Sequence, residues 1–385
     1  MARLDMHDAL SISEFSFPSA AIIPGNWRAE ITHDLAYLEE PWTDLEARAD
    51  GTLFQSHAWC RSWIEANRHA GCRVDLHVLS IWSSGRLVLL WPLVRRRLGP
   101  YVVLQTLGDP ATQYSDALVE RCANREPWIE AAWNALTSLA GIDAVLLRGV
   151  RADAAVAPVL AARCGHFVTR REEAPFCDFR PDARGGPVRR RSGRTLNTLR
   201  RHRRDLAEHG AVVFEIIGDP AGRVAAMREA LRLKQAWLSR TNRISAGYAH
   251  PANQFFLETL ATDPDFFAAR ITVGGETAAV EAGIVRNGIY ASLVQSYDSR
   301  FAEHGPGRLL FWHMVEHAAE IGIEVLDFLA PSYPHKREWA NDAMPVSDYA
   351  IPLRIWGRGV VTYIKHIRPR AKTCVERLRR LRRSP

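Results

Sequence analysis

One order of predicted secondary-structure elements occurs twice along this chain, and that repetition restricts the fold more than any single motif. Each half reads strand, two helices, three strands, helix, strand, helix and strand, from hydrophobic periodicity and turn residues. The first half is predicted to contain strands at 27–34, 74–82, 86–97, 102–107, 144–147 and 166–179. The second is predicted to contain strands at 212–217, 266–273, 277–286, 289–297, 325–329 and 346–353. No sequence identity between the halves is evident, so only the pattern repeats.

This alternation predicts an α/β fold with a mixed sheet and two domains, which suits a chain of 385 residues. The stretch PDARGGP, rich in glycine and proline, indicates a linker between them. The predicted segments are a loose tail at 1–25, an N-terminal domain at 26–180, a linker and basic helix at 181–210, a second domain at 211–353 and a basic amphipathic helix at 354–385.

Several classes of protein are disfavoured by the composition. The longest apolar run, at 87–94, contains a proline and is far too short for a membrane span. The N-terminus lacks the apolar region of a signal peptide. Six scattered cysteines without a C-x-x-C pair disfavour a disulfide scaffold and a cysteine-rich zinc site. We therefore expect a cytoplasmic protein with reduced thiols.

The net charge of +7 hides two strongly basic segments. Residues 189–204 carry eight arginines and no acid, and residues 354–385 carry eleven basic residues against the single acid Glu376. The rest of the chain is acidic. Such segments favour an anionic partner, such as phosphates, nucleic acid or an anionic membrane surface. The alternative is that both are merely solvated helix faces.

The C-terminal segment has a further pattern. An apolar stripe among its many basic residues predicts a helix at 358–382 that can lie on an anionic bilayer, at the inner face of the membrane. The residues of this stripe are Ile364, Ile367, Val375, Leu378 and Leu381.

A different helix carries a motif of metalloenzymes. His313, Glu316 and His317 read H-x-x-E-H, which is typical of inverted zinc peptidases. With Glu320 they share one arc of about 100° on a helix whose other faces are apolar. A zinc site needs the same arrangement, so geometry alone leaves both readings open. We interpret the arc as the polar stripe of an amphipathic helix and expect no metal.

Beyond this order, specific residues are similar to those of a known family. The matching residues in the second half are Tyr297-Asp298, Pro306-Gly307, Leu310, Asp327-Phe328, Lys336, Trp339 and Asp348 before Pro352-Leu353. FQSHAWCRSW, LGDPATQYSDALV and LRRHRRDLAEHG also match. Over 27–353 the chain resembles the CelD-like acetyltransferases, two-domain GNAT proteins related to Fem-type aminoacyl transferases. The resemblance implies two tandem GNAT-like domains, the first degenerate, and an acyl-CoA co-substrate, with acetyl-CoA expected.

The resemblance also implies where the donor binds. Gly305 and Gly307 begin the helix after the donor loop, and a helix start suits a pyrophosphate. Four more residues are expected to bind the cofactor, namely Tyr297, Arg300, Arg308 and Lys336. The loop departs from the superfamily pattern, because Ala302 replaces a Gln or Arg and Pro306 lacks an N–H. The alternative is a plain turn that starts a helix.

Acyl transfer to an amine needs a base and an acid. Glu281 stands alone in the apolar strand TAAVEAGIV, where burial would raise its pKa, and is expected to be the base. Tyr333 or His335 is expected to be the acid, although relatives usually carry tyrosine at the latter position. Tyr114 and Asp116 match the family pattern and are expected to bind the acceptor. A turn with an Asx cap is the alternative for this pair.

The expected activity is therefore N-acyl transfer from acyl-CoA to a small amine, in envelope or polysaccharide synthesis by family resemblance alone. One alternative is a Fem-type transferase that takes its acyl group from aminoacyl-tRNA, which the arginine-rich helix favours. The other is a nucleic-acid or membrane-binding scaffold with a decayed GNAT core.

Overall fold

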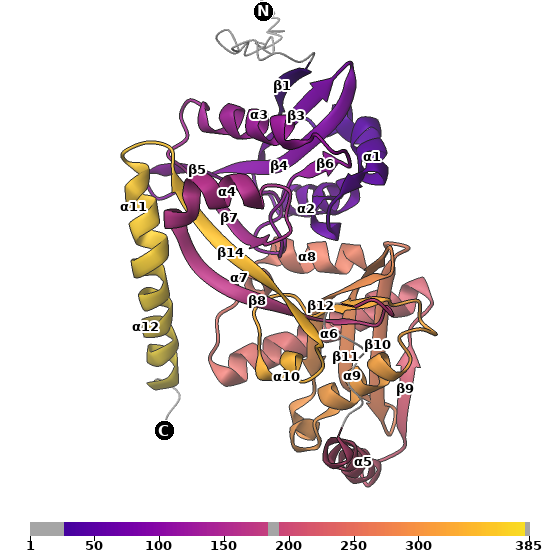
Figure 1. Ribbon diagram of the computed structural model, residues 1–385. Helices are drawn as coiled ribbons and strands as arrows, with labels where there is room; N and C mark the ends of the chain where they lie inside the picture. The colour runs from indigo at the N-terminus through magenta and orange to yellow at the C-terminus, as the bar shows by residue number, and fades with distance from the viewer. Residues whose placement is uncertain (1–26, 184–191, 382–385) are drawn as a thin grey trace, which may run out of the picture.

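The computed structural model describes residues 27–183 and 192–381 of the chain, with side chains described as far as 377 (Figure 1). The predicted tail at 1–25 lies outside the described residues, as do the arginines at 189–191. In the described residues, both halves follow the predicted order.

The first half contains β1 (Trp27–Thr32), α1 (Glu39–Arg48), α2 (His57–His69), β3 (Asp75–Ser83), β4 (Arg86–Leu98), β5 (Tyr101–Thr106), α3 (Glu126–Thr137), β7 (Ala144–Arg151), α4 (Ala157–Cys164) and β8 (Val168–Asp178). Two short strands that the sequence did not predict, β2 (Ala49–Asp50) and β6 (Leu118–Glu120), pair with each other at its edge. The basic helix α5 (Gly193–Ala207) follows.

The second half contains β9 (Val212–Ile216), α6 (Pro220–Thr241), α7 (Ala246–Ala249), α8 (Pro251–Leu260), β10 (Phe266–Val273), β11 (Glu276–Arg286), β12 (Ile289–Tyr297), α9 (Pro306–Glu316), β13 (Val325–Asp327), α10 (Pro334–Arg337) and β14 (Asp342–Pro352). The chain ends with α11 (Gly357–Thr362), a π-helical turn (Tyr363–Ile367) and α12 (Arg368–Leu381), where one continuous helix was predicted.

The strands form a single mixed sheet in the order β1-β3-β4-β5-β7-β14-β8-β13-β12-β11-β10-β9. β5 pairs in parallel with β7, and β12 pairs in parallel with β13, at corresponding places in the two halves. Every other neighbouring pair is antiparallel. The chain is therefore a mixed α/β protein, as the sequence predicted.

The two halves exchange their last strands. β8 ends the first half but pairs with β13 of the second, and β14 ends the second half but lies between β7 and β8 (Figure 1). Both strands cross the middle of the sheet in opposite directions. Since the sheet runs through both halves, a division into domains at 180 and 211 stays a prediction.

Helices from the two halves share a core on one face of the sheet. α2 packs on α8, and the rings of Trp59 and Phe256 meet edge to face with centroids 4.8 Å apart. α3 and α4 cover the first half with a separate core, and α5 and α9 lie on the second half. Asp219 is the N-cap of α6, and its side chain accepts a hydrogen bond from Gly222 N. Asn242, in the left-handed conformation, is the C-cap. These caps fix the length of the helix that borders the candidate site.

Candidate functional site

The parallel strands β12 and β13 separate soon after they meet. They pair at Ile289 to Ala291, and from Ser292 onward β12 keeps its pairing with β11 but leaves β13. A bulge at Leu293 of β12, opposite Ala282 and Gly283 of β11, accompanies this separation. A Cβ at Gly283 would lie 2.0 Å from the carbonyl oxygen of Ala291, so only glycine fits there. The result is a free strand edge in the middle of the second half.

Side chains from α6 and α7 reach the backbone of that edge. Tyr248 donates its hydroxyl hydrogen to the carbonyl of Leu293 (2.9 Å), and Lys234 Nζ donates to the carbonyl of Gln295 (3.0 Å). The ammonium of Lys234 also lies 5.4 Å from the centre of the Tyr248 ring. Polar side chains therefore take the place that β13 would occupy in a closed sheet.

Glu281 lies next to this edge on β11 and is completely buried. Its Oε1 accepts hydrogen bonds from the hydroxyls of Tyr290 (3.0 Å) and Ser292. Among the described residues, no hydrogen-bond donor is found for its Oε2. Burial raises the pKa of Glu281 to about 7, against the opposing effects of these hydroxyls and two lysines. A carboxyl group of this kind can exchange a proton near neutral pH.

The two lysines near Glu281 are themselves removed from water. Burial lowers the pKa of Lys234, and it lowers the pKa of Lys336 to about 8. Lys336 Nζ donates to the carbonyl of Leu329 (2.9 Å). The negative charges of Asp327 and Glu281 oppose the lowering of its pKa. The structure thus places Lys336, expected to bind the cofactor, in one electrostatic cluster with Glu281.

Tyr333 and His335 are the expected acids. Tyr333 is the N-cap of α10, and His335 lies on that helix next to Lys336. Their rings stack with centroids 5.7 Å apart, and Tyr333 is 42% exposed. Partial burial and the nearby charges of Lys336 and Lys234 lower the pKa of His335. Both side chains are accessible from solvent, whereas Glu281 is not.

The start of α9 forms another side of the site. Gly305 adopts φ +54° as the N-cap, and its carbonyl accepts from the N–H groups of Arg308 and Leu309. Among the described residues, no acceptor is found for the N–H of Gly307. A Cβ at Gly307 would lie 3.6 Å from Gln295 Nε2, so this helix start adjoins the free edge of β12. Pro306 has no N–H, as the sequence indicated, and the N–H groups of Arg308 and Leu309 are already bonded, so few free donors remain at this helix start.

The expected phosphate-binding arginines already have partners. Arg300 forms ion pairs with Asp298 and Glu276, and Arg308 forms one with Glu338. The basic helix α5 lies against α9, and a Cβ at Gly305 would lie 3.2 Å from Nδ1 of His202 on that helix. Tyr297 ends β12 and lines a small cavity of about 130 Å³ beside Arg232 and Arg240 of α6. Basic side chains therefore lie near the C-terminal end of β12, beside Tyr297.

The separated parallel strands, the glycine-framed helix start and the buried carboxyl group agree with a comparison of sequence families. Residues 193–337 match the family described as the acetyltransferase (GNAT) domain. This segment is a GNAT domain. No curated protein sequence matches the chain significantly.

Among solved structures, FemX is similar to this chain in fold. FemX shares 11% identity with this chain, at a TM-score of 0.52 over 88% of this chain and all of FemX. Two further structures match with lower TM-scores. They are a tandem GNAT protein from the clavulanic acid biosynthesis pathway (14% identity, TM-score 0.45, 85% of this chain and 99% of that one) and L-PGS from Bacillus licheniformis (14%, 0.46, 84% and 97%). At 11% identity the likeness to FemX shows the fold alone.

Tyr114 and Asp116, assigned to the acceptor from the sequence, lie inside the protein. Tyr114 is 2% exposed and donates its hydroxyl hydrogen to Asp327 of the GNAT domain, 2.9 Å from both carboxylate oxygens. Asp116 is also buried and accepts from the N–H groups of Ala117, Ala155 and Val156. The acceptor assignment therefore needs correction: Tyr114 joins the halves, and Asp116 caps local backbone.

We expect Tyr114→Phe to lower the free energy of unfolding by about 1–3 kcal/mol, because it leaves the buried Asp327 without its hydroxyl partner. Burial already raises the pKa of Asp327, and the guanidinium of Arg151 opposes that rise. Urea titration followed by tryptophan fluorescence measures the change. Tyr37→Phe is the control, since that tyrosine is 59% exposed. An unchanged midpoint in the Tyr114 variant would remove this hydrogen bond from the junction.

The H-x-x-E-H residues have partners other than a metal. His313 stacks on Phe214 with ring centroids 4.8 Å apart, and Glu316 accepts from the indole N–H of Trp312. α9 ends at Glu316, so His317 is already its C-cap, contrary to the longer helix expected from the sequence. Within the described part of the chain, the only side chains grouped closely enough to share a metal are His33, Asp75 and His77, at the far edge of the sheet.

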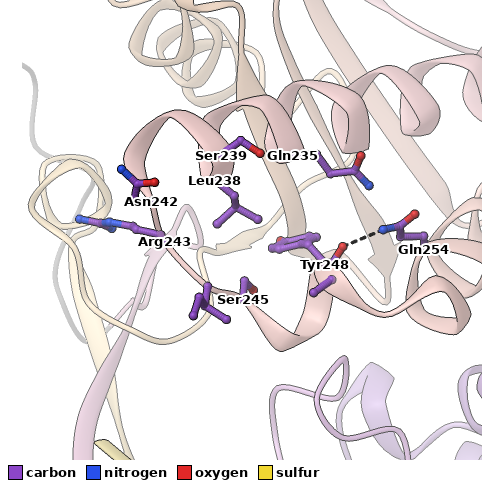
Figure 2. Close-up of a pocket in the computed structure, with 10 residues that line it drawn as sticks. Gln235, Leu238, Ser239, Asn242, Arg243, Ser245, Tyr248 and Gln254 are labelled. Atoms are coloured by element: carbon purple, nitrogen blue, oxygen red, sulfur yellow. Dashed lines mark hydrogen bonds between the residues drawn. The ribbon is translucent and has the colours of Figure 1, made fainter. Parts of the chain in front are cut away.

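A cavity of about 620 Å³ opens beside the GNAT site, where α6 ends and α7 begins (Figure 2). Tyr248 is part of its wall and also bonds to the β12 edge, so this side chain contacts both the cavity and that edge. Five of the ten lining residues are polar and uncharged, and Arg243 adds one positive charge. The polar uncharged residues are Gln235, Ser239, Asn242, Ser245 and Gln254.

Sequence reasoning missed Lys234, Tyr248 and Asp327 as members of the site. Lys234 is one of several basic residues in α6, and no local pattern shows that it is buried. Tyr248 lies in a four-residue helix without periodicity. Asp327 was noticed only as a match to the family. A buried cation on a helix is recognisable only once the strand edge it contacts is known.

Proposed function

We propose that this protein is an N-acyltransferase that moves an acyl group, expected to be acetyl, from acyl-CoA to a small amine. The observation that supports this most is Glu281, buried beside the free edge of β12 with a pKa of about 7. The start of α9 and its basic surroundings suit the pyrophosphate of CoA.

In the proposed reaction the amine attacks the thioester carbonyl while its proton passes to Glu281, directly or through water. Nitrogen forms a bond to carbon, the carbonyl oxygen takes up negative charge, and the carbon–sulfur bond then breaks. The ammonium groups of Lys234 and Lys336 stabilise the added charge. Tyr333, His335 or Lys336 returns a proton to the departing thiolate. The pKa of Lys336, lowered to about 8, suits it to that step.

The cavity beside Tyr248 is the proposed acceptor site. Its amide and hydroxyl side chains can bind the hydroxyl groups of an amino sugar, and Arg243 can bind a carboxylate of an amino acid. Either acceptor fits envelope or polysaccharide synthesis. The six cysteines are all free thiols, which supports the cytoplasmic location expected from the sequence.

A Fem-type reaction with aminoacyl-tRNA is the second candidate, and the position of α5 favours it. This helix lies against α9 and its described arginines are exposed, so they would bind phosphates of a nucleic acid as readily as those of CoA.

Native mass spectrometry of protein purified without added ligand is the experiment that tests the donor. We expect a CoA species to be retained, and micromolar binding of acetyl-CoA in calorimetry. Retained RNA, with no calorimetric response to acetyl-CoA, would instead establish the tRNA-dependent candidate. Dialysed lysozyme, also a basic protein, serves as a control for nonspecific binding of phosphates.

A further inference from the structure

The segment from Arg354 to Arg377, called here the C-terminal surface, exposes an unusual amount of apolar side chain. Ile355 is 72% exposed and Trp356 is 73% exposed, the two highest values among the large apolar residues described. Of eleven such exposed residues, five lie on this surface. They are Ile355, Trp356, Tyr363, Ile367 and Val375. Exposed apolar area gathered in so few residues indicates a surface that contacts something other than water.

Positive charge accompanies this apolar area. The C-terminal surface carries seven basic side chains against the single acid Glu376, and within the described residues no salt bridge neutralises any of the seven. The basic residues are Arg354, Arg358, Lys365, Arg368, Arg370, Lys372 and Arg377. A partner must therefore offer negative charge beside an apolar phase.

The C-terminal surface is also held in place at both ends. Val360 of α11 is completely buried and packs with Val103 and Ala144 of the sheet. At the other end, Glu376 of α12 accepts a hydrogen bond from the N–H of Ile244 (3.3 Å). The helix between them is exposed along most of its length and runs down the side of the molecule (Figure 1). Its apolar and basic groups are thus presented from a fixed frame.

We propose that the C-terminal surface binds an anionic lipid bilayer and lies in the headgroup region. Trp356 and Ile355 enter the boundary between headgroups and acyl chains, and the basic side chains bind the lipid phosphates. None of the helices in the described residues combines the length and the apolar character that a membrane span needs.

A bilayer fits this surface better than a nucleic acid does. Phosphates of RNA would satisfy the basic residues, and Trp356 or Tyr363 could stack on a base. The aliphatic side chains of Ile355, Ile367 and Val375 have no partner on RNA, whereas the acyl boundary of a bilayer removes all three from water.

Binding would also orient the cavity of Figure 2. Ile244, whose N–H holds Glu376, lines that cavity, so a bilayer-bound α12 lies beside its rim. This step rests on the proposed function: if the cavity holds the acceptor, the acceptor reaches it from the membrane surface.

Vesicle sedimentation of the full chain tests the proposal. We expect binding to vesicles of one part phosphatidylglycerol to three parts phosphatidylcholine in 50 mM salt, at least tenfold weaker binding in 500 mM salt, and none to pure phosphatidylcholine. Ile355→Ser with Trp356→Ser should weaken binding to the anionic vesicles at least tenfold, with an unchanged melting temperature. Arg368→Glu with Lys372→Glu should do the same.

Two controls make the outcome specific. Val213→Ser with Ile216→Ser removes exposed apolar residues from the distant edge strand β9 and should leave vesicle binding unchanged. Acetyl-CoA binding should also be unchanged in all these variants, so failure of the membrane proposal is distinct from failure of the proposed function. No binding of wild-type protein to anionic vesicles in low salt would overturn the proposal. So would equal binding by the Ile355 and Trp356 variant, or binding to RNA alone.

Discussion

Glu281→Gln is expected to lower the turnover number about 10²–10⁴-fold, the usual contribution of a general base. The amide has nearly the shape of the carboxyl group and can still accept from Tyr290 and Ser292, so the strand should keep its place. It cannot take up the proton of the amine. Steady-state kinetics with acetyl-CoA and an amino-sugar or amino-acid acceptor measure the loss, and calorimetry should show little change in the affinity for CoA.

The pH profile separates a base from a structural residue. With a pKa of about 7, Glu281 becomes ionised as the pH rises through neutrality, so the wild-type rate should increase with pH over that range. The glutamine variant should lack this limb. The control is Glu258→Gln, since Glu258 pairs with Arg228 on the surface of α8 and should leave rate and profile unchanged.

The pH dependence of stability is an independent test of the role of Glu281. Its pKa is higher in the folded protein than the usual 4.5, so the folded state holds the proton more tightly than the unfolded chain does. That contribution is complete below about pH 4.5 and is lost as the pH rises through about 7. A glutamine variant that melts lower at pH 8 but keeps its turnover would assign Glu281 to packing and not to chemistry.

Gly307→Asp is expected to weaken the binding of acetyl-CoA more than tenfold, or about 1.4 kcal/mol and above. The added carboxylate would stand at the N-terminus of α9, where it competes with the pyrophosphate for the N–H of residue 307 and repels it. A Cβ there meets only ordinary contact with Gln295, and an acid in the first turn favours the helix, so the melting temperature should not fall.

Gly307→Ala is the matched control for that change. It adds the same Cβ without the charge, and its affinity for acetyl-CoA in calorimetry should stay within about threefold of wild type. If the aspartate variant binds acetyl-CoA as wild type does, the start of α9 is not the pyrophosphate site, and the basic face of α5 becomes the place to examine.

Much of the fold could be predicted from the sequence because its signals are local. Strand β11 is apolar in its centre except for Glu281, which made this residue a candidate from the sequence alone. The helix α9 begins between its two glycines, with Gly305 as its N-cap and Gly307 in its first turn. The environment of Tyr114 could not be predicted, because its partner Asp327 is 213 residues away and the hydrogen bond depends on how the halves meet.

The pairing of β8 and β14 was beyond the sequence for a related reason. Hydrophobic periodicity shows that a strand is buried but not which strand lies beside it. β14 pairs on both sides with strands of the first half. Its sequence is equally compatible with pairing inside the second half. Only the assembled sheet distinguishes the two.

The exchange of these strands limits how such a protein can be divided. A cut in the segment between the halves would leave two fragments that each carry a strand belonging in the other's part of the sheet. Neither fragment could close its own sheet, so each would expose the hydrogen-bonding edges that the other normally covers. The fragments would have to recombine to regain activity, as in fragment complementation. The two halves are therefore not modular, and neither is expected to fold as a separate unit.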